Sequence, residues 1–397
     1  MAHLFSARWV WLAVALCLLI APFAGTANPH PPASDGIDLA QKSRAVDTLF
    51  ASYDSPYTPG CVVGVMHQGR FIHAKGYGMA NLEHAIALTP RTRIRLDSMS
   101  KQFTAAAMIL LSEQGKVSLD DDIRKYLHEL PDYGDVITIR HLLAHRSGLP
   151  EYDQIGVQYE DWAEYYKDYE EFFRKDPWVH REVFFTQQTY LKRIASVSKL
   201  KFTPGSKFEY NNPGYFLMSQ IVERASGQTL AQFAQENIFR PLGMADTLFY
   251  DRVLEPLRDN ADGYLALPDG RFLVFNTNLN IVGEGGVITT LYDFLLWDEN
   301  FYANRLGNPD SQLMKLMRKP GIKEGDIGYG EPAYGLSVRR EGGLVVEVHG
   351  GAYVGFKTIA RRYPEKHFSV AVLCNRYDAD DLRDLSRRVA ELYLQDP

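Results

Sequence analysis

Basic runs and cysteines are scarce in this chain of 397 residues. It has 43 Lys and Arg against 49 Asp and Glu, and no stretch is rich enough in basic residues to neutralise a row of phosphates. We therefore expect no nucleic-acid partner. Hydrophobic residues at 46% and charged residues at 23% are ordinary globular values, which excludes disorder for most of the chain.

A long hydrophobic run stands at the N-terminus. Arg8 precedes an apolar segment at 9–24, which is followed by Gly25, Thr26 and Ala27. This run is shorter than the ~20 residues of a membrane span, whereas a basic start, an apolar centre and a small-residue end are typical of a secretory signal. The pattern predicts a signal peptide at 1–27 and a mature chain at 28–397. The protein is then periplasmic or secreted, without a stable membrane anchor after cleavage; a retained anchor is the alternative.

Two cysteines remain in the mature chain, Cys61 in CVVGVM and Cys374 in FSVAVLC. Two thiols do not make the disulfide framework of a small secreted domain. Because both lie in strand-like runs, and side-by-side strands seldom offer disulfide geometry, we predict buried free thiols. A disulfide between them is the alternative in an oxidising compartment.

The two ends of the mature chain have the pattern of one α+β unit. A helical periodicity opens it at 36–54, a hairpin pattern follows at 61–78 around Gln68 and Gly69, and strand-like runs occupy 343–351, 352–363 and 367–376 before an amphipathic helix at 378–395. Short turns between strands predict an antiparallel sheet, with the N- and C-terminal helices packed on it. We assign this α/β lobe to about 36–95 and 283–397, and an inserted all-helical lobe to about 96–282.

The stretch 151–190, inside the helical lobe, is rich in aromatic and acidic residues. One hypothesis makes it a lid or wall over a pocket. The alternative is ordinary helix packing.

Several familiar catalytic motifs are missing. The chain has no G-x-S-x-G, H-E-x-x-H, C-x-x-C or complete phosphate loop. His141 and His145 are spaced to share a helix face, but no acidic residue stands between them and no third ligand is evident, so we expect no metal site.

Ser-x-x-Lys occurs twice, as Ser98 to Lys101 and Ser196 to Lys199. A serine nucleophile needs a base nearby, and a helix supplies one because residues i and i+3 share a face. Ser98 follows Asp97, a residue typical of helix caps, and precedes the apolar helix pattern FTAAAMILLSEQ, so its hydroxyl is expected at a helix N-terminus. Ser196 is followed by Lys-Phe-Thr-Pro-Gly after the motif and is predicted to lie in a surface turn.

Two further motifs follow the first in order: Tyr210-Asn211-Asn212, and His349-Gly350-Gly351 on a predicted strand. Together with Ser98-x-x-Lys101 they resemble the three-motif set of the class C β-lactamase and penicillin-binding-protein-like serine hydrolases. HLLAHRSGLPEY, PLGMADT and GEGGVITTLYDFLLW also resemble that family, and the resemblance covers roughly 36–395. It implies an antiparallel sheet flanked by terminal helices plus a helical lobe, as the patterns predict.

The resemblance also implies a role for each motif residue. Ser98 would attack a carbonyl, Lys101 would take its proton, and Tyr210 would carry a proton to the leaving group. Asn212 would bond Lys101 or the substrate amide. The third motif, His349, Gly350 and Gly351, would line the pocket, and the N–H groups of Ser98 and Ala352 would form the oxyanion hole. No metal or organic cofactor is implied.

One position departs from many β-lactamases and transpeptidases, which carry Lys-Thr-Gly where this chain has His349-Gly350-Gly351. A mostly neutral His anchors a substrate carboxylate less well than Lys. We therefore expect a secreted serine hydrolase of small-molecule esters, amides or peptides: a peptidase, D-amino-acid amidase, carboxypeptidase or esterase. The alternatives are a true β-lactamase and a non-catalytic protein that binds peptidoglycan peptides.

Overall fold

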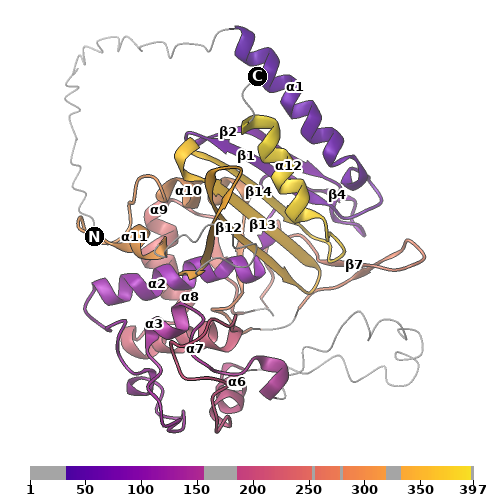
Figure 1. The fold of residues 1–397 in the computed structure, drawn as a ribbon. Helices are drawn as coiled ribbons and strands as arrows, with labels where there is room; N and C mark the ends of the chain where they lie inside the picture. Colours follow the sequence, from indigo (N-terminus) through magenta and orange to yellow (C-terminus); the bar gives the residue numbers. More distant parts are fainter. Residues whose placement is uncertain (1–32, 156–185, 253–254, 278–279, 319–331, 395–397) are drawn as a thin grey trace, which may run out of the picture.

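The computed structural model describes residues 33–155, 186–252, 255–277, 280–318 and 332–394 (Figure 1). The predicted signal peptide at 1–27 lies outside these residues, as does most of the aromatic and acidic stretch 151–190. Within the described ranges, no helix combines the length and apolarity needed to cross a membrane.

A seven-stranded antiparallel sheet forms the centre of the fold, in the order β10-β11-β12-β13-β14-β1-β2. Its strands are β1 (Cys61–His67), β2 (Arg70–Tyr77), β10 (Pro332–Ala333), β11 (Leu336–Glu341), β12 (Leu344–Tyr353), β13 (Phe356–Tyr363) and β14 (Phe368–Cys374). Pairing of β1 with β14 joins the two ends of the chain, which confirms the antiparallel sheet predicted from the sequence.

Two turns set the register of this sheet. Gln68 and Gly69 both have positive φ, as a two-residue hairpin turn requires, so the predicted hairpin forms between β1 and β2. The later turn falls at Val354 and Gly355, where Gly355 has φ +76°. Ala352 and Tyr353 therefore end β12, instead of opening the next strand as predicted.

The prediction of free thiols is wrong in this structure, because Cys61 and Cys374 form a disulfide. The two residues are direct partners in the β1–β14 register, with Cα atoms 4.0 Å apart. Antiparallel residues that face each other approach closely enough for their sulfurs to meet, and the sequence does not specify this register. Both residues are fully buried.

The terminal helices α1 (Ala33–Leu49) and α12 (Leu382–Leu394) cover one face of the sheet, with the short turn η1 (Ala51–Tyr53) between α1 and β1 (Figure 1). Val46 and Phe50 from the first segment and Val389 from α12 join strand residues in one buried cluster. The apolar faces of the helices predicted at 36–54 and 378–395 therefore pack on the sheet, as predicted.

The other face carries the helical region. Its helices and turns are η2 (Asp97–Ser100), α2 (Lys101–Glu113), η3 (Ile123–Lys125), α3 (Ile139–Leu143), η4 (Tyr152–Ile155), α6 (Gln187–Ala195), α7 (Asn212–Ser226), α8 (Leu230–Ala234), η6 (Gln235–Phe239) and α9 (Arg240–Leu242). Later in the chain come α10 (Leu291–Asn300), α11 (Leu313–Met317) and η7 (Pro364–Lys366). Every residue of α2 from Lys101 to Leu111 is buried, so α2 forms the centre of this region.

The remaining strands of the described residues are short and pair in small sheets of two or three strands. They are β3 (Met79–Asn81) with β4 (Ile86–Ala87), β5 (Ile94–Arg95) with β9 (Val287–Thr289) and β6 (Leu248–Phe249), and β7 (Tyr264–Ala266) with β8 (Phe272–Val274). The segment 96–282 is thus mainly helical and includes β6, β7 and β8. Pairing of β5 with β9 brings the residues before Ser98 next to the segment that follows Gly283.

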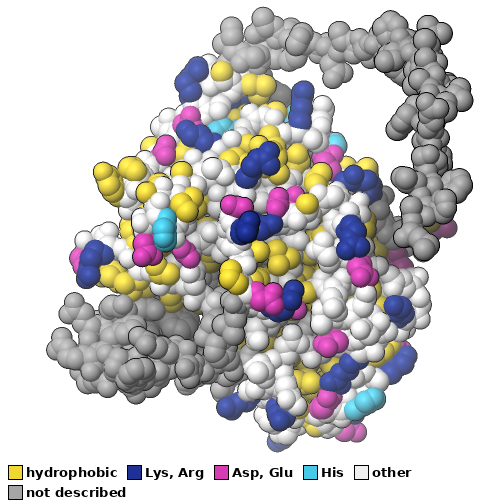
Figure 2. All heavy atoms as spheres, turned by 180° about the vertical axis from the view of Figure 1, so that it is seen from behind, with side chains coloured by type: hydrophobic (Ala, Val, Ile, Leu, Met, Phe, Trp, Pro, Cys, Tyr) yellow, Lys and Arg dark blue, Asp and Glu magenta, His cyan; other side chains and the backbone are white. Residues whose placement is uncertain are grey.

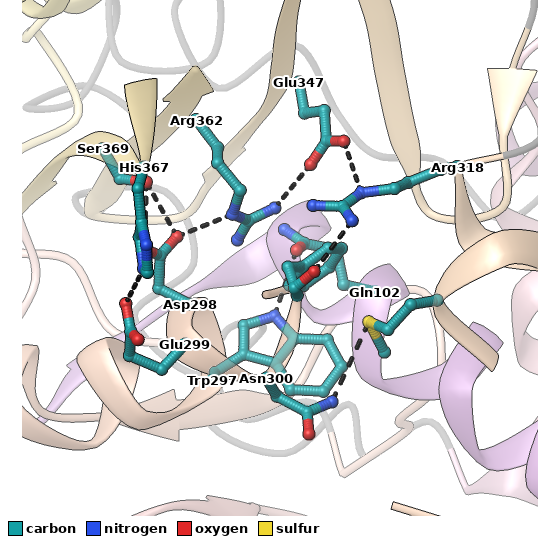
Figure 3. A network of polar contacts seen from close by, with 12 residues as sticks. Gln102, Trp297, Asp298, Glu299, Asn300, Arg318, Glu347, Arg362, His367 and Ser369 are labelled. Carbon is teal, nitrogen blue, oxygen red and sulfur yellow. Dashed lines mark hydrogen bonds and ion pairs between the residues drawn. The ribbon is translucent and has the colours of Figure 1, made fainter. Parts of the chain in front are cut away.

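Buried ion pairs link α10 to the sheet (Figure 3). Arg362 of β13 bonds Asp298 of α10 at 2.7 Å and Glu347 of β12 at 3.0 Å. Next to them, Trp297 donates from Nε1 to Gln102 Oε1 at 3.1 Å. Since Gln102 follows Lys101, this network fixes α2 against α10 and the sheet.

On the face seen in Figure 2, acidic and basic side chains of the described residues are interspersed rather than gathered by sign.

Candidate active site

Ser98 lies in the turn η2, which runs directly into α2, so the hydroxyl stands at the N-terminus of this helix as predicted. Asp97 does not act as the predicted cap, because η2 follows Leu96 without a side-chain cap. Instead, Asp97 has φ +48° and is buried, and its carboxyl accepts the N–H of Tyr353. This hydrogen bond links the turn that carries Ser98 to β12.

Lys101 points from the first turn of α2 toward Ser98. Its Nζ lies 3.2 Å from Ser98 Oγ, 2.8 Å from Asn212 Oδ1 and 2.7 Å from the carbonyl oxygen of Glu284. These contacts bring the first and second predicted motifs together. They also use all three donors of an ammonium group.

Burial lowers the pKa of Lys101, while the nearby carboxyl groups of Glu284, Glu151 and Asp97 oppose this shift. The side chain has no solvent exposure, so its charged form loses hydration. A lysine with a lowered pKa can exist in the neutral form near pH 7. Only that form can accept the proton of Ser98.

Two sets of hydrogen bonds fix the second motif: a helix cap at Asn211 and two bonds between Asn212 and Glu151. Asn211 caps α7 by accepting the N–H of Gly214 at 2.9 Å, which places Asn212 in the first turn of the helix. Glu151 accepts the N–H of Asn212 at 2.8 Å and its side-chain Nδ2 at 3.2 Å. Glu151 therefore directs the amide oxygen of Asn212 toward Lys101.

Tyr210 lies just before α7 with its ring against both Lys101 and His145. Lys101 Nζ is 4.9 Å from the ring centroid, and the His145 ring stacks on it at 4.5 Å. His145 is buried and accepts the N–H of Asn211 through Nδ1 at 3.0 Å, so it supports the loop that carries Tyr210.

The third motif lies on β12 beyond the end of its pairing with β11. The β11–β12 register stops at Val348, and in the described chain no strand pairs with residues 349–353 on that side. At Gly351, a Cβ atom would stand 2.1 Å from the carbonyl oxygen of Leu96 and 3.0 Å from the amide nitrogen of Ser98. Glycine is therefore required where β12 meets the turn that carries Ser98.

His349 is half-buried, and its Nδ1 lies 2.7 Å from the carbonyl oxygen of Gly350. Loss of hydration in the pocket wall, followed by the charge of Lys101, lowers the pKa of His349 to about 4. The imidazole is therefore neutral at pH 7, as expected for a histidine at this position.

Two cavities meet at Ser98 and Ala352. The larger, of about 420 Å³, has a mixed lining. It includes the apolar residues Phe208, Val348 and Ile359, the charged residues Arg339, Lys357, Asp380 and Arg383, and also Tyr210, His145, His349, Gly350 and Gly351. The smaller, of about 240 Å³, is lined by Arg95, Asp97, Asn212, Glu284 and Tyr353 among others. Every residue predicted for the site therefore lies at one of the cavities or, for Lys101, in hydrogen-bond contact with Ser98.

The chain from 46 to 394 matches the family model described as Beta-lactamase. It belongs to the beta-lactamase family. Penicillin-binding protein 4* of Bacillus subtilis (strain 168) is 27% identical over 369 residues, which cover 88% of this chain and 75% of that protein. A D-aminopeptidase of Gluconobacter oxydans (strain 621H) is 27% identical over 342 residues, or 86% of this chain. The chain spans only 59% of the length of that relative.

Solved structures of similar proteins have the same fold as this chain. The octameric penicillin-binding protein homologue from Pyrococcus abyssi has a TM-score of 0.73 and 25% identity, with coverage of 90% of this chain and 77% of its own. The D-amino acid amidase of Ochrobactrum anthropi SV3 has a TM-score of 0.68 at 21% identity, with coverage of 89% and 98%. The predicted family, fold class and serine hydrolase class are thereby confirmed.

Three residues of this beta-lactamase-family site were not singled out from the sequence, namely Arg95, Glu151 and Glu284, and His145 was considered only as a metal ligand. His145 and Glu151 stand in HLLAHRSGLPEY, and Glu284 stands in GEGG, both of which resemble family sequence. Polar residues inside these family-like stretches could therefore have been chosen as candidate site residues from the sequence. Burial raises the pKa of both Glu284 and Glu151, and the hydroxyl of Tyr152 donates to Glu284 Oε1 at 3.2 Å.

The second Ser-x-x-Lys, Ser196 to Lys199, is not part of the lining of either cavity. Ser196 is an exposed residue directly after α6, and its hydroxyl donates to the carbonyl oxygen of Arg193, which agrees with the predicted surface turn. His145 lies beyond the end of α3, with φ +54°, so it does not share a helix face with His141. Among the described residues, no three His, Cys, Asp or Glu side chains gather as a metal site would require.

Proposed function

We propose that this protein is an exported hydrolase that cleaves ester or amide bonds through an acyl-enzyme on Ser98. The observation that best supports this proposal is the position of Lys101. Its buried amine lies 3.2 Å from Ser98 Oγ and forms hydrogen bonds with Asn212 and the carbonyl oxygen of Glu284. Such an arrangement of nucleophile, base and orienting groups is typical of covalent catalysis.

In the acylation step, neutral Lys101 takes the proton of Ser98 as Oγ attacks the carbonyl carbon. The N–H groups of Ser98 and Ala352 bind the oxyanion, each donor being worth ~3 kcal/mol of barrier lowering. Tyr210, which contacts both Lys101 and His145 through its ring, gives its hydroxyl proton to the departing alcohol or amine and takes up the proton that Lys101 received from Ser98. A water molecule then attacks the acyl carbon and gives one proton to neutral Lys101, which returns it to Ser98 Oγ as the acid product leaves.

The substrate we propose is a small ester, an amide or a peptide with an apolar acyl or aryl group. The apolar residues in the lining of the larger cavity, Phe208, Val348 and Ile359, support this choice. Relatives named D-aminopeptidase and D-amino acid amidase make D-aminoacyl amides a natural part of the test panel. Neutral His349 in place of a lysine argues against efficient turnover of β-lactams, which carry a carboxylate.

Export is proposed from the signal pattern at 1–27. The Cys61–Cys374 disulfide supports it, since disulfides persist mainly in oxidising compartments. The predicted lid at 151–190 lies mostly outside the described residues.

The test is covalent labelling with a fluorophosphonate and with fluorescent penicillin, followed by kcat/KM for p-nitrophenyl esters, D- and L-aminoacyl anilides and nitrocefin. Labelling with turnover of an ester or anilide supports the proposal. Nitrocefin as the best substrate would make the protein a true β-lactamase. Penicillin binding without labelling or turnover of any substrate would favour the non-catalytic peptide-binding alternative.

A further inference from the structure

Arg95 is a buried arginine that has no hydrogen-bond or ion-pair partner in the described part of the chain, although the carboxyl group of Asp97 interacts with its charge. It ends strand β5, three residues before Ser98, and only 7% of its surface is exposed. No hydrogen bond or ion pair joins its guanidinium group to any described residue. Arg361 and Arg362, which are also buried, are both paired: Arg361 with Glu341, and Arg362 with Asp298 and Glu347.

An unpaired buried charge is costly, so its presence in a fold suggests a ligand. A guanidinium group presents its donors in a planar fork that matches a carboxylate.

The cavity that Arg95 lines reaches the nucleophile. Its volume is about 240 Å³, and Ser98, Asn212 and Ala352 are part of its wall. It meets the larger cavity at Ser98 and Ala352, so one substrate could occupy both while its carbonyl lies at Ser98. The smaller cavity has room for a short polar group, since a water molecule takes ~30 Å³.

Two carboxyl groups line the same cavity but do not pair with Arg95. Asp97 accepts the N–H of Tyr353, and Glu284 Oε1 accepts the hydroxyl of Tyr152. Burial raises the pKa of both, and the charge of Arg95 opposes this shift at Asp97. Because neither carboxyl group forms an ion pair with Arg95, its guanidinium group remains available to a ligand.

We propose that Arg95 binds a carboxylate of the substrate, in the smaller cavity beside Ser98. This inference rests on the proposed function and narrows it to esters or amides that carry a carboxylate a few bonds from the carbonyl attacked by Ser98. The site lies on the Arg95 and Glu284 side of the nucleophile, whereas the lysine of related β-lactamases would stand at His349.

The experiment compares succinate with succinamide, which has the same shape without charge. Both are measured as inhibitors of p-nitrophenyl butyrate hydrolysis, and both as ligands that raise Tm, a readout that needs no catalysis. Wild type should bind succinate roughly tenfold or more tighter, because a charged pair replaces neutral hydrogen bonds. Arg95→Gln should lose this preference in the Tm comparison, and Arg95→Lys should keep part of it.

Arg93→Gln is the matched control. It removes the same charge two residues away, from a guanidinium already paired with Asp246 at 2.6 Å, and should keep the wild-type preference. Equal affinity of wild type for the two ligands, or an Arg95→Gln protein that still prefers succinate, would overturn the inference. Wild type without ester turnover or Ser98 labelling would instead overturn the proposed function, while the Tm comparison would still decide the carboxylate site. If Arg95→Gln does not fold, wild type and Arg95→Lys decide it.

Discussion

Lys101 Nζ lies 2.8 Å from Asn212 Oδ1, although the two residues are 111 positions apart. This hydrogen bond joins the N-termini of α2 and α7, and Glu151 fixes its acceptor through two bonds to Asn212. The amine is thereby held between Ser98 and an amide oxygen in a site without solvent exposure at Lys101. Its basicity then depends on the carboxyl groups around it.

The first prediction concerns the nucleophile. Ser98→Ala should abolish covalent labelling by a fluorophosphonate, because the hydroxyl next to Lys101 is removed. Ser196→Ala is the control, since Ser196 is exposed and bonds only locally. Labelling lost with Ser196→Ala but kept with Ser98→Ala would reverse the assignment.

The second prediction concerns pH. Lys101 acts as a base only when neutral, so kcat/KM should fall as the pH drops through its lowered pKa. The carboxylate of Glu284 raises the pKa of Lys101, so Glu284→Gln should move this acid limb to lower pH, by up to about one unit. Glu255→Gln, at an exposed residue paired with Arg252, should leave the limb in place. A shift to higher pH, or none, would contradict this coupling.

A third prediction tests Tyr210. Loss of a positioned acid or base typically costs ~10²–10⁴ in rate, so Tyr210→Phe should lose at least the lower figure in kcat with its Tm unchanged. Tyr57→Phe, at a side chain that is 83% exposed, is the matched control. A well-folded, fully active Tyr210→Phe enzyme would mean that the proton travels by another route.

A fourth prediction concerns His349, whose lowered pKa keeps it neutral at pH 7. His349→Lys restores a positive charge at the third motif and should raise kcat/KM for nitrocefin relative to a neutral p-nitrophenyl ester, by roughly tenfold. His349→Gln keeps the site neutral and should not change the ratio. If both variants have the wild-type ratio, the charge at this position does not set β-lactam preference.

How much of this site the sequence predicts depends on how close in the chain the contacting residues are. Ser98 and Lys101 share one helical turn, so their spacing together with the apolar helix pattern that follows predicted their contact. Asn212 came from the motif's resemblance to a family. Glu151 and Glu284 could not be placed, because their contacts join loops far from α2 in the sequence. The Cys61–Cys374 disulfide was missed for the same reason, since register between β1 and β14 is a tertiary property.

The last prediction concerns the buried network beneath α2 (Figure 3). Asp298 accepts from Arg362 at 2.7 Å and from the hydroxyl of Ser369, and both Asp298 and Arg362 are buried. Asp298→Ala leaves the Arg362 charge with Glu347 alone and should lower the free energy of unfolding by ~3–5 kcal/mol.

Its neighbour on α10 supplies the comparison. Glu299 pairs with His367 at 2.8 Å, but both side chains are partly exposed, so Glu299→Ala should cost only ~0–1 kcal/mol. Urea denaturation, followed by circular dichroism, measures both variants. Equal losses would mean that burial does not set the strength of these pairs. Because Trp297 also bonds Gln102, the folded Asp298→Ala protein should still label at Ser98, which separates its effect on stability from any effect on the site.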